Sequence, residues 1–345
     1  MSFVQNHFYQ YQMTFERFRS SLLSKIENIQ KHNFEEVALE VFQFQATYNP
    51  LYKSYLDLIS CKPTEISALS QIPFLPIQLF KKYTIQTGQW SAEQIFSSSG
   101  TTSQNASFHH LRSKEWYQKI ATTAFHYFYG SPKDYCFLGL LPAYLERQGS
   151  SLIYMVQEFI QLSKYNESGF FLYNTESLLE IIEKCRKRQI PTVLIGVSFA
   201  LLDLAEQHAP NLGDVIVMET GGMKGRRKEI TRKELHTQLQ NAFGIDAIHS
   251  EYGMTELFSQ AYSKGNGIFY PSPAMKILAN EVTDPFARQK FGKTGVLQVV
   301  DLGNIDTISF IATEDLTKVY KDGSFEVLGR LDASDIRGCN LLIGA

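Results

Sequence analysis

Apolar side chains recur every three or four positions in the N-terminal part of the chain, up to about residue 75. Phe15, Phe18, Leu22 and Ile26 follow this spacing, and residues 37–42 continue it. Positions repeated at this interval lie on one face of an α-helix. The pattern therefore predicts that the chain begins with helices.

From Gln94 onward, short apolar runs alternate with helical patterns. The runs are Tyr135–Leu141, Thr192–Gly196 and Asp214–Met218. Each run is rich in β-branched or aromatic residues and ends in a turn residue, as buried strands do. Strands alternating with helices indicate a layered α/β fold.

The pattern changes again after Gly295. Val296–Val300, Thr307–Ile311 and Ser324–Leu328 alternate like antiparallel strands, and Lys321–Gly323 is typical of a tight turn. The chain is thus predicted to be α/β, with four parts. These are an N-terminal helical segment (1–93), an α/β core (94–294), a β-rich subdomain (295–328), and a hinge with the C-terminal tail (329–345).

Composition and charge exclude several classes of protein. The 345 residues include 33 Lys+Arg and 35 Asp+Glu, a formal net charge of −2, so no basic surface for nucleic acid is expected. No apolar run approaches the roughly 20 residues that cross a bilayer. The start of the chain is polar and aromatic, unlike a secretory signal. We therefore expect a cytoplasmic protein with no membrane span.

The four cysteines are Cys61, Cys136, Cys185 and Cys339, and no two form a CxxC pair. Neither a zinc knuckle nor a thioredoxin-like redox pair is therefore predicted. The first three lie among apolar or helical residues and are expected to be buried, inert thiols. Cys339 stands in a different context.

A run of small hydroxyl residues surrounds a glycine at Phe96–Ser103, with the sequence FSSSGTTS. Backbone N–H groups and hydroxyls in such a loop can donate to a phosphate, and the glycine permits close approach. The run lacks the lysine of a GxxxxGK[ST] loop. Taken alone, it is also compatible with an ordinary surface loop.

Three further motifs follow in order: Glu251–Glu256 (EYGMTE), Thr313–Leu316 (TEDL) and Gly329–Asp332 (GRLD). Together with SSSGTT, this series resembles the motifs of the adenylate-forming (acyl-AMP synthetase) superfamily. TEDL departs from the usual TGDL but keeps Asp315. The resemblance implies the large N-terminal part of that fold, without the mobile C-terminal lid domain.

A narrower resemblance rests on Leu141–Leu152, Glu219–Arg227 and Gly329–Cys339, which look like segments of LuxE-type acyl-protein synthetases. Those enzymes activate a fatty acid with ATP, hold it as a thioester on their own cysteine, and deliver it to a fatty acyl reductase. The resemblance therefore implies an AMP-forming acid–thiol ligase. It also implies ATP and Mg²⁺ as cofactors, a fatty or related carboxylic acid as substrate, and a reductase as possible partner.

The superfamily's roles can be carried onto matching positions. Thr255 would contact the α-phosphate, Glu256 would bind Mg²⁺, and Tyr252 would stack on adenine. The remaining nucleotide-binding residues would be the phosphate-loop residues Ser97, Ser98, Ser99, Gly100, Thr101 and Thr102, the adenine-side Gly221 and Gly222, and the ribose-binding Asp315 and Arg330.

Two catalytic roles need residues outside those motifs. The resemblance implies that another cation replaces the lid lysine, and Lys224, in a basic cluster that extends to Lys228, is our candidate. The cluster is equally compatible with a solvated basic helix face. Cys339, preceded by Arg337 and Gly338, is our candidate acyl-carrying nucleophile, because a thiolate accepts acyl groups well.

Three alternatives remain. Gly196–Ala200 (GVSFA) partly matches the nucleophile elbow of a serine hydrolase, with Asp214 and either His236 or His249 as partners. That interpretation leaves the four adenylation motifs unexplained. The acyl group could instead pass to free coenzyme A or an amine, or the chain could be a non-catalytic acyl-binding subunit.

Overall fold

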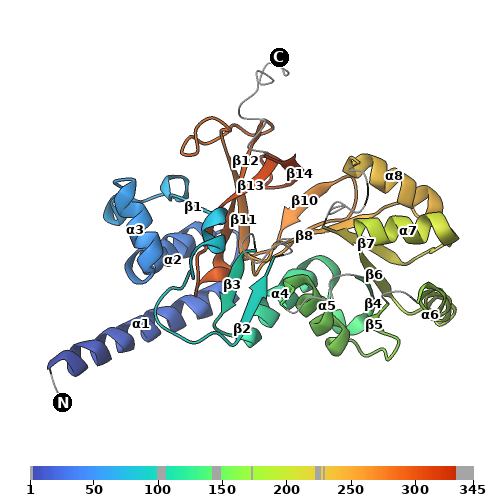
Figure 1. Cartoon of the computed structure of the whole chain (residues 1–345), viewed down its shortest axis with the longest axis horizontal. Helices are drawn as coiled ribbons and strands as arrows, with labels where there is room; N and C mark the ends of the chain where they lie inside the picture. Colours follow the sequence, from blue (N-terminus) through green and yellow to red (C-terminus); the bar gives the residue numbers. More distant parts are fainter. Residues whose placement is uncertain are drawn as a thin grey trace. The chain divides into compact units, whose positions relative to one another are not determined.

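The computed structural model describes residues 3–98, 106–141, 149–171, 174–221, 227 and 230–331, and side chains from residue 13 onward. The chain forms two compact units, whose elements are labelled in Figure 1. The terminal unit contains Met1–Leu79, Ile85–Gln89 and Met275–Ala345, and the central unit contains Phe80–Thr84 and Trp90–Ala274.

This division groups the chain differently from the sequence pattern. The N-terminal helices share the terminal unit with the strands that follow residue 274, rather than forming a part of their own. The physical reason is that an amphipathic helix must cover its apolar face, and Phe42 of α2 packs its ring against Phe310 of β13, with the ring centroids 6.1 Å apart.

The terminal unit joins helices to an antiparallel sheet in the order β11-β12-β13-β14, with the short β1 parallel to β13. Its helices are α1 (Phe3–Glu27), α2 (Phe34–Tyr48), α3 (Pro50–Leu58), and the 3-10 turns η1 (Pro63–Glu65), η2 (Leu69–Gln71) and η5 (Leu302–Asn304). Its strands are β1 (Leu75–Pro76), β11 (Met275–Asn280), β12 (Thr294–Asp301), β13 (Phe310–Val319) and β14 (Phe325–Arg330). The turn η3 (Ile77–Lys81) spans the boundary between the units.

The expected strand Thr307–Ile311 begins later, at Phe310. The preceding turn is held by buried side chains instead of a strand ladder. Gln45 donates to the carbonyl oxygens of Asn304 and Ile305, each at 3.1 Å, and Asn49 donates to that of Thr307 at 2.8 Å. Side-chain amides on α2 and at its end thus satisfy backbone groups that would otherwise require a neighbouring strand.

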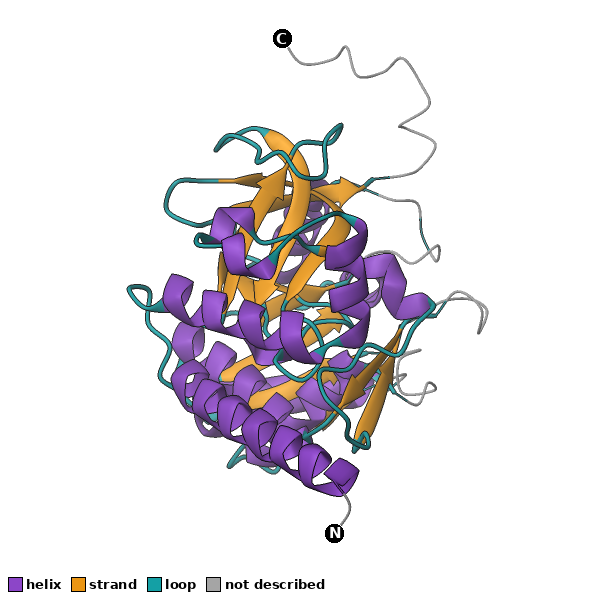
Figure 2. Cartoon of the chain, turned by 90° about the vertical axis from the view of Figure 1, so that its left-hand side faces the viewer, coloured by secondary structure: helices purple, strands orange, loops and turns teal. Residues whose placement is uncertain are grey.

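The central unit contains a mostly parallel sheet, and helices alternate with its strands along the chain. Figure 2 colours the helices of the whole chain purple and its strands orange. Its strands are β4 (Cys136–Leu140), β5 (Gly169–Phe170), β6 (Thr192–Val197), β7 (Ile216–Thr220), β8 (His249–Tyr252), β9 (Ala261–Ser263) and β10 (Ile268–Pro271), with a separate ribbon of β2 (Gln94–Ser97) and β3 (Phe108–Leu111). Its helices are α4 (Lys114–Tyr129), η4 (Pro132–Asp134), α5 (Ser151–Leu162), α6 (Thr175–Lys187), α7 (Ser198–His208) and α8 (Arg232–Phe243).

The order of this sheet is β10-β9-β8-β7-β6-β4-β5, and the neighbours from β8 to β5 are parallel. The chain moves from β4 outward to β5 and then returns past β4 to β6. This reversal places a topological switch point between β4 and β6, where α/β sheets open a crevice at their carboxyl ends. The predicted α/β class is confirmed.

Among the described residues, no helix is both long and apolar enough to cross a membrane.

We predict that Asp306→Asn lowers the free energy of unfolding by about 3 kcal/mol, because breaking a buried ion pair leaves its partner charge uncompensated. The Arg19 guanidinium donates to both oxygens of Asp306, at 2.5 and 2.7 Å, and the two side chains are only 12% and 5% exposed. Urea-induced unfolding measures the effect. Glu65→Gln is the control, because the Lys62–Glu65 pair is 72% and 66% exposed and its loss should change stability by less than about 1 kcal/mol. Equal effects in the two variants would contradict the prediction.

Candidate active site

The parallel strands of the central unit bring Gly221 and the EYGMTE motif to one edge of the sheet. Gly221 follows the carboxyl end of β7, and the segment from Gly253 to Glu256 follows that of β8. The two ends are level, because Thr220 lies beside Glu251 in the strand register. Ligands of open α/β sheets bind at this edge.

Hydrogen bonds from backbone N–H groups hold the two ends of the hydroxyl-rich loop together. Ser98 N–H donates to the carbonyl of Ser107 at 3.0 Å, and Ser107 N–H donates back to the Ser98 hydroxyl at 2.9 Å. Ser97 N–H donates to the carbonyl of Gly149 at 2.8 Å. Of the predicted phosphate-loop residues, Ser99, Gly100, Thr101 and Thr102 lie outside the described residues.

Ser107, which directly precedes β3, and His109 on β3 connect this loop to the EYGMTE motif through two contacts that we call the β3 clamp. The Ser107 hydroxyl donates to the Glu256 carboxylate, and His109 Nδ1 lies 2.8 Å from the Thr255 carbonyl oxygen. Since a carbonyl only accepts, Nδ1 carries the proton. The clamp brings the loop base beside Thr255 and Glu256, although about 150 residues separate them.

The clamp is buried in aromatic surroundings. His109 packs edge-on against Phe80 and tilted against Phe258, with centroids 5.5 and 5.2 Å away. Burial lowers the pKa of His109 to about 4, so the ring is neutral at physiological pH. The sequence alone gave neither Ser107 nor His109 a role. The alternation of Phe108–Leu111, which buries His109 and Leu111 together, is the signal that indicates an inward-facing histidine.

Gly221 and Tyr252, the described residues of the predicted adenine side, lie at the same edge. Gly221 adopts φ +69°, a conformation that favours glycine. The Tyr252 ring is buried and lies 6.0 Å, centroid to centroid, from the Phe269 ring. Gly222 and Lys224 lie outside the described residues.

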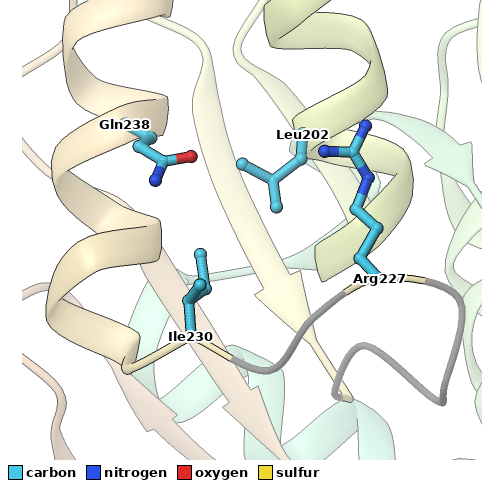
Figure 3. A pocket seen from close by; sticks show the side chains of 4 residues that line it. All are labelled: Leu202, Arg227, Ile230 and Gln238. Carbon is cyan, nitrogen blue, oxygen red and sulfur yellow. The ribbon is translucent and has the colours of Figure 1, made fainter.

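One member of the basic cluster is described, and it is paired. The Arg227 guanidinium donates to Glu206 at 2.7 Å and also to Asp203, both on α7. These bonds raise the pKa of Arg227, despite the opposing effect of partial burial. Arg227 lines a cavity of about 290 Å³ with Leu202, Ile230 and Gln238, in which Leu202 of α7 faces Gln238 of α8 (Figure 3). Arg227 is therefore neutralised locally, which makes it a poor substitute for the lid lysine.

A serine hydrolase requires a hydrogen bond from its nucleophilic serine to a histidine, and neither His236 nor His249 makes one with Ser198. The Ser198 hydroxyl donates to the carbonyl of Gly221 at 3.0 Å and lies 3.4 Å from the Glu219 carboxylate. His236 contacts the other oxygen of Glu219, at 3.5 Å, and His249 pairs with the Tyr129 hydroxyl. Neither histidine is placed to take the proton of Ser198, as a serine nucleophile requires.

In the terminal unit, Asp315 and Arg330 lie opposite each other on β13 and β14. Arg330 Nε is 3.5 Å from Asp315 Oδ1, and the arginine side chain is 72% exposed whereas the aspartate is buried. Glu314, which replaces the usual glycine, accepts from Gln78 at 2.8 Å. Successive strand residues point to opposite faces, so the Glu314 side chain does not alter the face of β13 on which Asp315 lies.

Two of the three described cysteines are buried, as the sequence predicts. Cys136 and Cys185 are buried, and burial raises the pKa of Cys136 to about 12. Cys61 is partly exposed. Cys339 lies outside the described residues.

No family model matches the chain, and no curated protein sequence matches it. Solved structures do. A 2-hydroxyisobutyryl-CoA ligase, in complex with 2-HIB-AMP and CoA in the thioesterification state, is 13% identical, with a TM-score of 0.65 over 90% of this chain and 71% of that one.

Two further structures are similar over a smaller part. An ATP-bound RpMatB–BxBclM chimera is 16% identical, with a TM-score of 0.53 over 70% of this chain and 49% of that one. MatB from Rhodopseudomonas palustris is 17% identical, with a TM-score of 0.50 over 68% and 47%. The chain spans about half the length of these two proteins.

The chain therefore has the fold of the adenylate-forming enzymes, as expected from its motif series. The matched part corresponds to the large N-terminal portion of that fold.

We predict that Ser107→Ala lowers the free energy of unfolding by about 2 kcal/mol, because a buried carboxylate loses a hydrogen-bond donor. Ser107 and Glu256 are 1% and 8% exposed, so little water can replace the hydroxyl. Denaturant unfolding of the full chain measures the change. The control is Ser24→Ala, an exposed helical position where the change should stay within about 0.5 kcal/mol. Unchanged stability in Ser107→Ala would show that the bond from Ser107 to Glu256 contributes nothing to stability.

Proposed function

We propose that this protein activates a carboxylic acid with ATP to an acyl-adenylate and then transfers the acyl group to the thiol of Cys339. It would thus be an AMP-forming acid–thiol ligase of the LuxE type. The observation that carries the proposal is the β3 clamp, which joins the base of the hydroxyl-rich loop to Thr255 and Glu256. The adenylate-forming fold and the 2-HIB-AMP and ATP bound in similar structures support it.

In the first step, a carboxylate oxygen of the substrate attacks the α-phosphorus of ATP, and pyrophosphate leaves. Residues Ser97–Thr102 would hold the phosphates through hydroxyl and N–H donors, and Thr255 would contact the α-phosphate. Fixed donors of this kind stabilise the charge that develops on the phosphate oxygens.

Glu256 suits a magnesium ion at this place. Mg²⁺ is usually held by one or two carboxylates together with substrate phosphates and water, and Glu256 lies beside the base of the proposed phosphate loop. The ion supplies positive charge that offsets the triphosphate. The Ser107 hydroxyl would orient the carboxylate toward it.

The nucleoside would be held by the residues that the superfamily motifs assign to it. Tyr252, Gly221 and Gly222 would bind adenine, and Asp315 would accept from the ribose hydroxyls. Arg330, largely exposed beside Asp315, would contact ribose and phosphate. Lys224 would supply the cation that the lid lysine provides in other members of the superfamily.

In the second step, the sulfur of Cys339 attacks the acyl carbon, AMP leaves, and the thiol proton is released. The acyl group would then pass to a fatty acyl reductase or another acceptor. A fatty acid is the substrate that the LuxE-type segments favour.

The test is the mass of the intact protein after incubation with ATP, Mg²⁺ and a panel of fatty acids. We predict an acyl adduct, cleavable by hydroxylamine, on the wild type and on Cys61→Ser, but not on Cys339→Ser. Cys61→Ser is the matched control because Cys61 is a partly exposed thiol outside the proposed site.

Two other outcomes contradict parts of the proposal. Pyrophosphate release without an adduct would keep adenylation but move the acceptor to coenzyme A or an amine. No pyrophosphate release with any acid would contradict adenylation itself.

A further inference from the structure

Two aromatic rings meet on the face of the central sheet that carries Tyr252. The rings of Tyr252 on β8 and Phe269 on β10 lie 6.0 Å apart, centroid to centroid, with 65° between their planes. Edge-to-face pairs at this distance attract, because the positive edge of one ring meets the negative face of the other. Phe269 is fully buried, whereas Tyr252 retains 8% exposure at the carboxyl end of β8. Phe269 therefore influences a bound ligand only through a neighbour such as Tyr252.

The contact between the rings depends on the strand that separates them. The sheet order is β10-β9-β8, so the rings must meet across β9. Ala261 of β9 is paired with Tyr252 on one side and with Pro271 on the other, which places all three on one face. Alternation along the strands adds Ser263 and Phe269 to that face. The two β9 side chains there are small, and this leaves room for the flanking rings to touch.

Arg232, the first residue of α8, lies over the Phe269 ring. Its guanidinium carbon is 4.9 Å from the ring centroid, close enough for a cation–π interaction. The same side chain donates from Nε to Oε1 of Glu219 on β7, at 3.1 Å, and His236 on α8 lies 3.5 Å from that oxygen. One buried carboxylate thus fixes the start of α8 against the sheet, and with it the guanidinium above Phe269.

We propose that Phe269 and Arg232 are positioning residues for nucleotide binding, which hold the Tyr252 ring in the orientation that stacks on adenine. This inference rests on the proposed function, in which Tyr252 binds the base. The contacts run from Arg232 through Phe269 to Tyr252, and all three residues lie in the central unit. A ring that is held in its binding orientation loses less conformational entropy when the ligand arrives, so the affinity for the base rises.

A double-mutant cycle tests whether Phe269 acts through Tyr252. Equilibrium binding of ATP to the full chain is compared for the wild type, Tyr252→Leu, Phe269→Leu and the double variant. We expect Tyr252→Leu to weaken binding by roughly 10-fold, the lower range for base–aromatic stacking. Phe269→Leu should weaken it by roughly 5-fold, within the range for loss of an aromatic pair. In the Tyr252→Leu background, Phe269→Leu should add no further loss, because its effect passes through the missing ring.

Inorganic tripolyphosphate separates positioning of the base from a general structural effect. It carries phosphates as ATP does but has no base, so its affinity should stay at the wild-type value in Phe269→Leu. The matched control is Phe159→Leu, because Phe159 of α5 is also buried in the central unit but packs on Phe125 and Phe137. This control should lower stability without changing the affinity for either ligand.

Arg232→Lys tests the same contacts by a second route. Lysine keeps a positive charge beside Glu219 but lacks the planar guanidinium that lies over the Phe269 ring. We expect affinity for ATP to fall by roughly 3-fold and affinity for tripolyphosphate to stay unchanged. The arginine side chain is 29% exposed, so this variant disturbs the core less than Phe269→Leu and serves as the test if that protein fails to fold.

The results that would overturn the inference differ in what they leave of the proposed function. If Tyr252→Leu weakens ATP binding while Phe269→Leu and Arg232→Lys bind ATP like the wild type, the adenine assignment stands and the positioning role is wrong. Additive losses in the double variant, or equal losses for ATP and tripolyphosphate, also exclude that role. If Tyr252→Leu binds ATP as the wild type does, the adenine assignment fails and the inference fails with it.

Discussion

The candidate site depends on satisfying a buried carboxylate. Glu256 is largely removed from water and takes a hydrogen bond from Ser107, while His109 donates to the adjoining Thr255 carbonyl. An unpaired carboxylate at that depth would cost several kcal/mol, so the segment around Ser107 and the EYGMTE motif cannot separate without a penalty. Because Ser107 also closes the base of the hydroxyl-rich loop through Ser98, one pair of contacts sets the position of loop and motif together. The chemistry proposed for phosphate and metal requires that arrangement.

The pairing of Asp315 with Arg330 in the terminal unit depends on a β-bulge. The register of β13 and β14 shifts between Leu316 and Thr317, at the level of Gly329, which adopts φ +136°. Such a bulge re-aims the residue that follows, and here it leaves Arg330 opposite Asp315. The glycine of the GRLD motif therefore serves the backbone geometry, and its arginine is the residue to which the proposed function assigns contacts with ribose and phosphate. A motif of four letters thus combines a conformational requirement with a chemical one.

The sequence was sufficient for the features that are local. Tyr135–Leu141, Thr192–Gly196 and Asp214–Met218 contain the apolar periods of buried strands, and all three correspond to strands β4, β6 and β7. The motif series likewise indicated the fold that the solved structures share. Contacts between distant segments were not predictable. Nothing near Ser107 or His109 in the chain points to Thr255 or Glu256, and the grouping of N-terminal helices with late strands depends on tertiary burial of faces such as that of Phe42.

Two neighbouring acids on β7 and β8 show why residue type alone does not decide a role. Glu219 and Glu251 are both buried, and burial by itself would raise the pKa of each carboxyl. For Glu219, hydrogen bonds from His236 and Ser250 and the charge of Arg232 more than offset burial, and its pKa falls below the usual value. Glu251 has one neutral hydroxyl partner and the like charge of Glu219 nearby, so its pKa stays raised. Two carboxyls of the same type on adjacent strands thus have pKa values shifted in opposite directions by their hydrogen-bond and charged neighbours. Glu219 therefore links β7 to α8 through Arg232 and His236, whereas Glu251 accepts a hydrogen bond from Thr220 of the neighbouring strand β7.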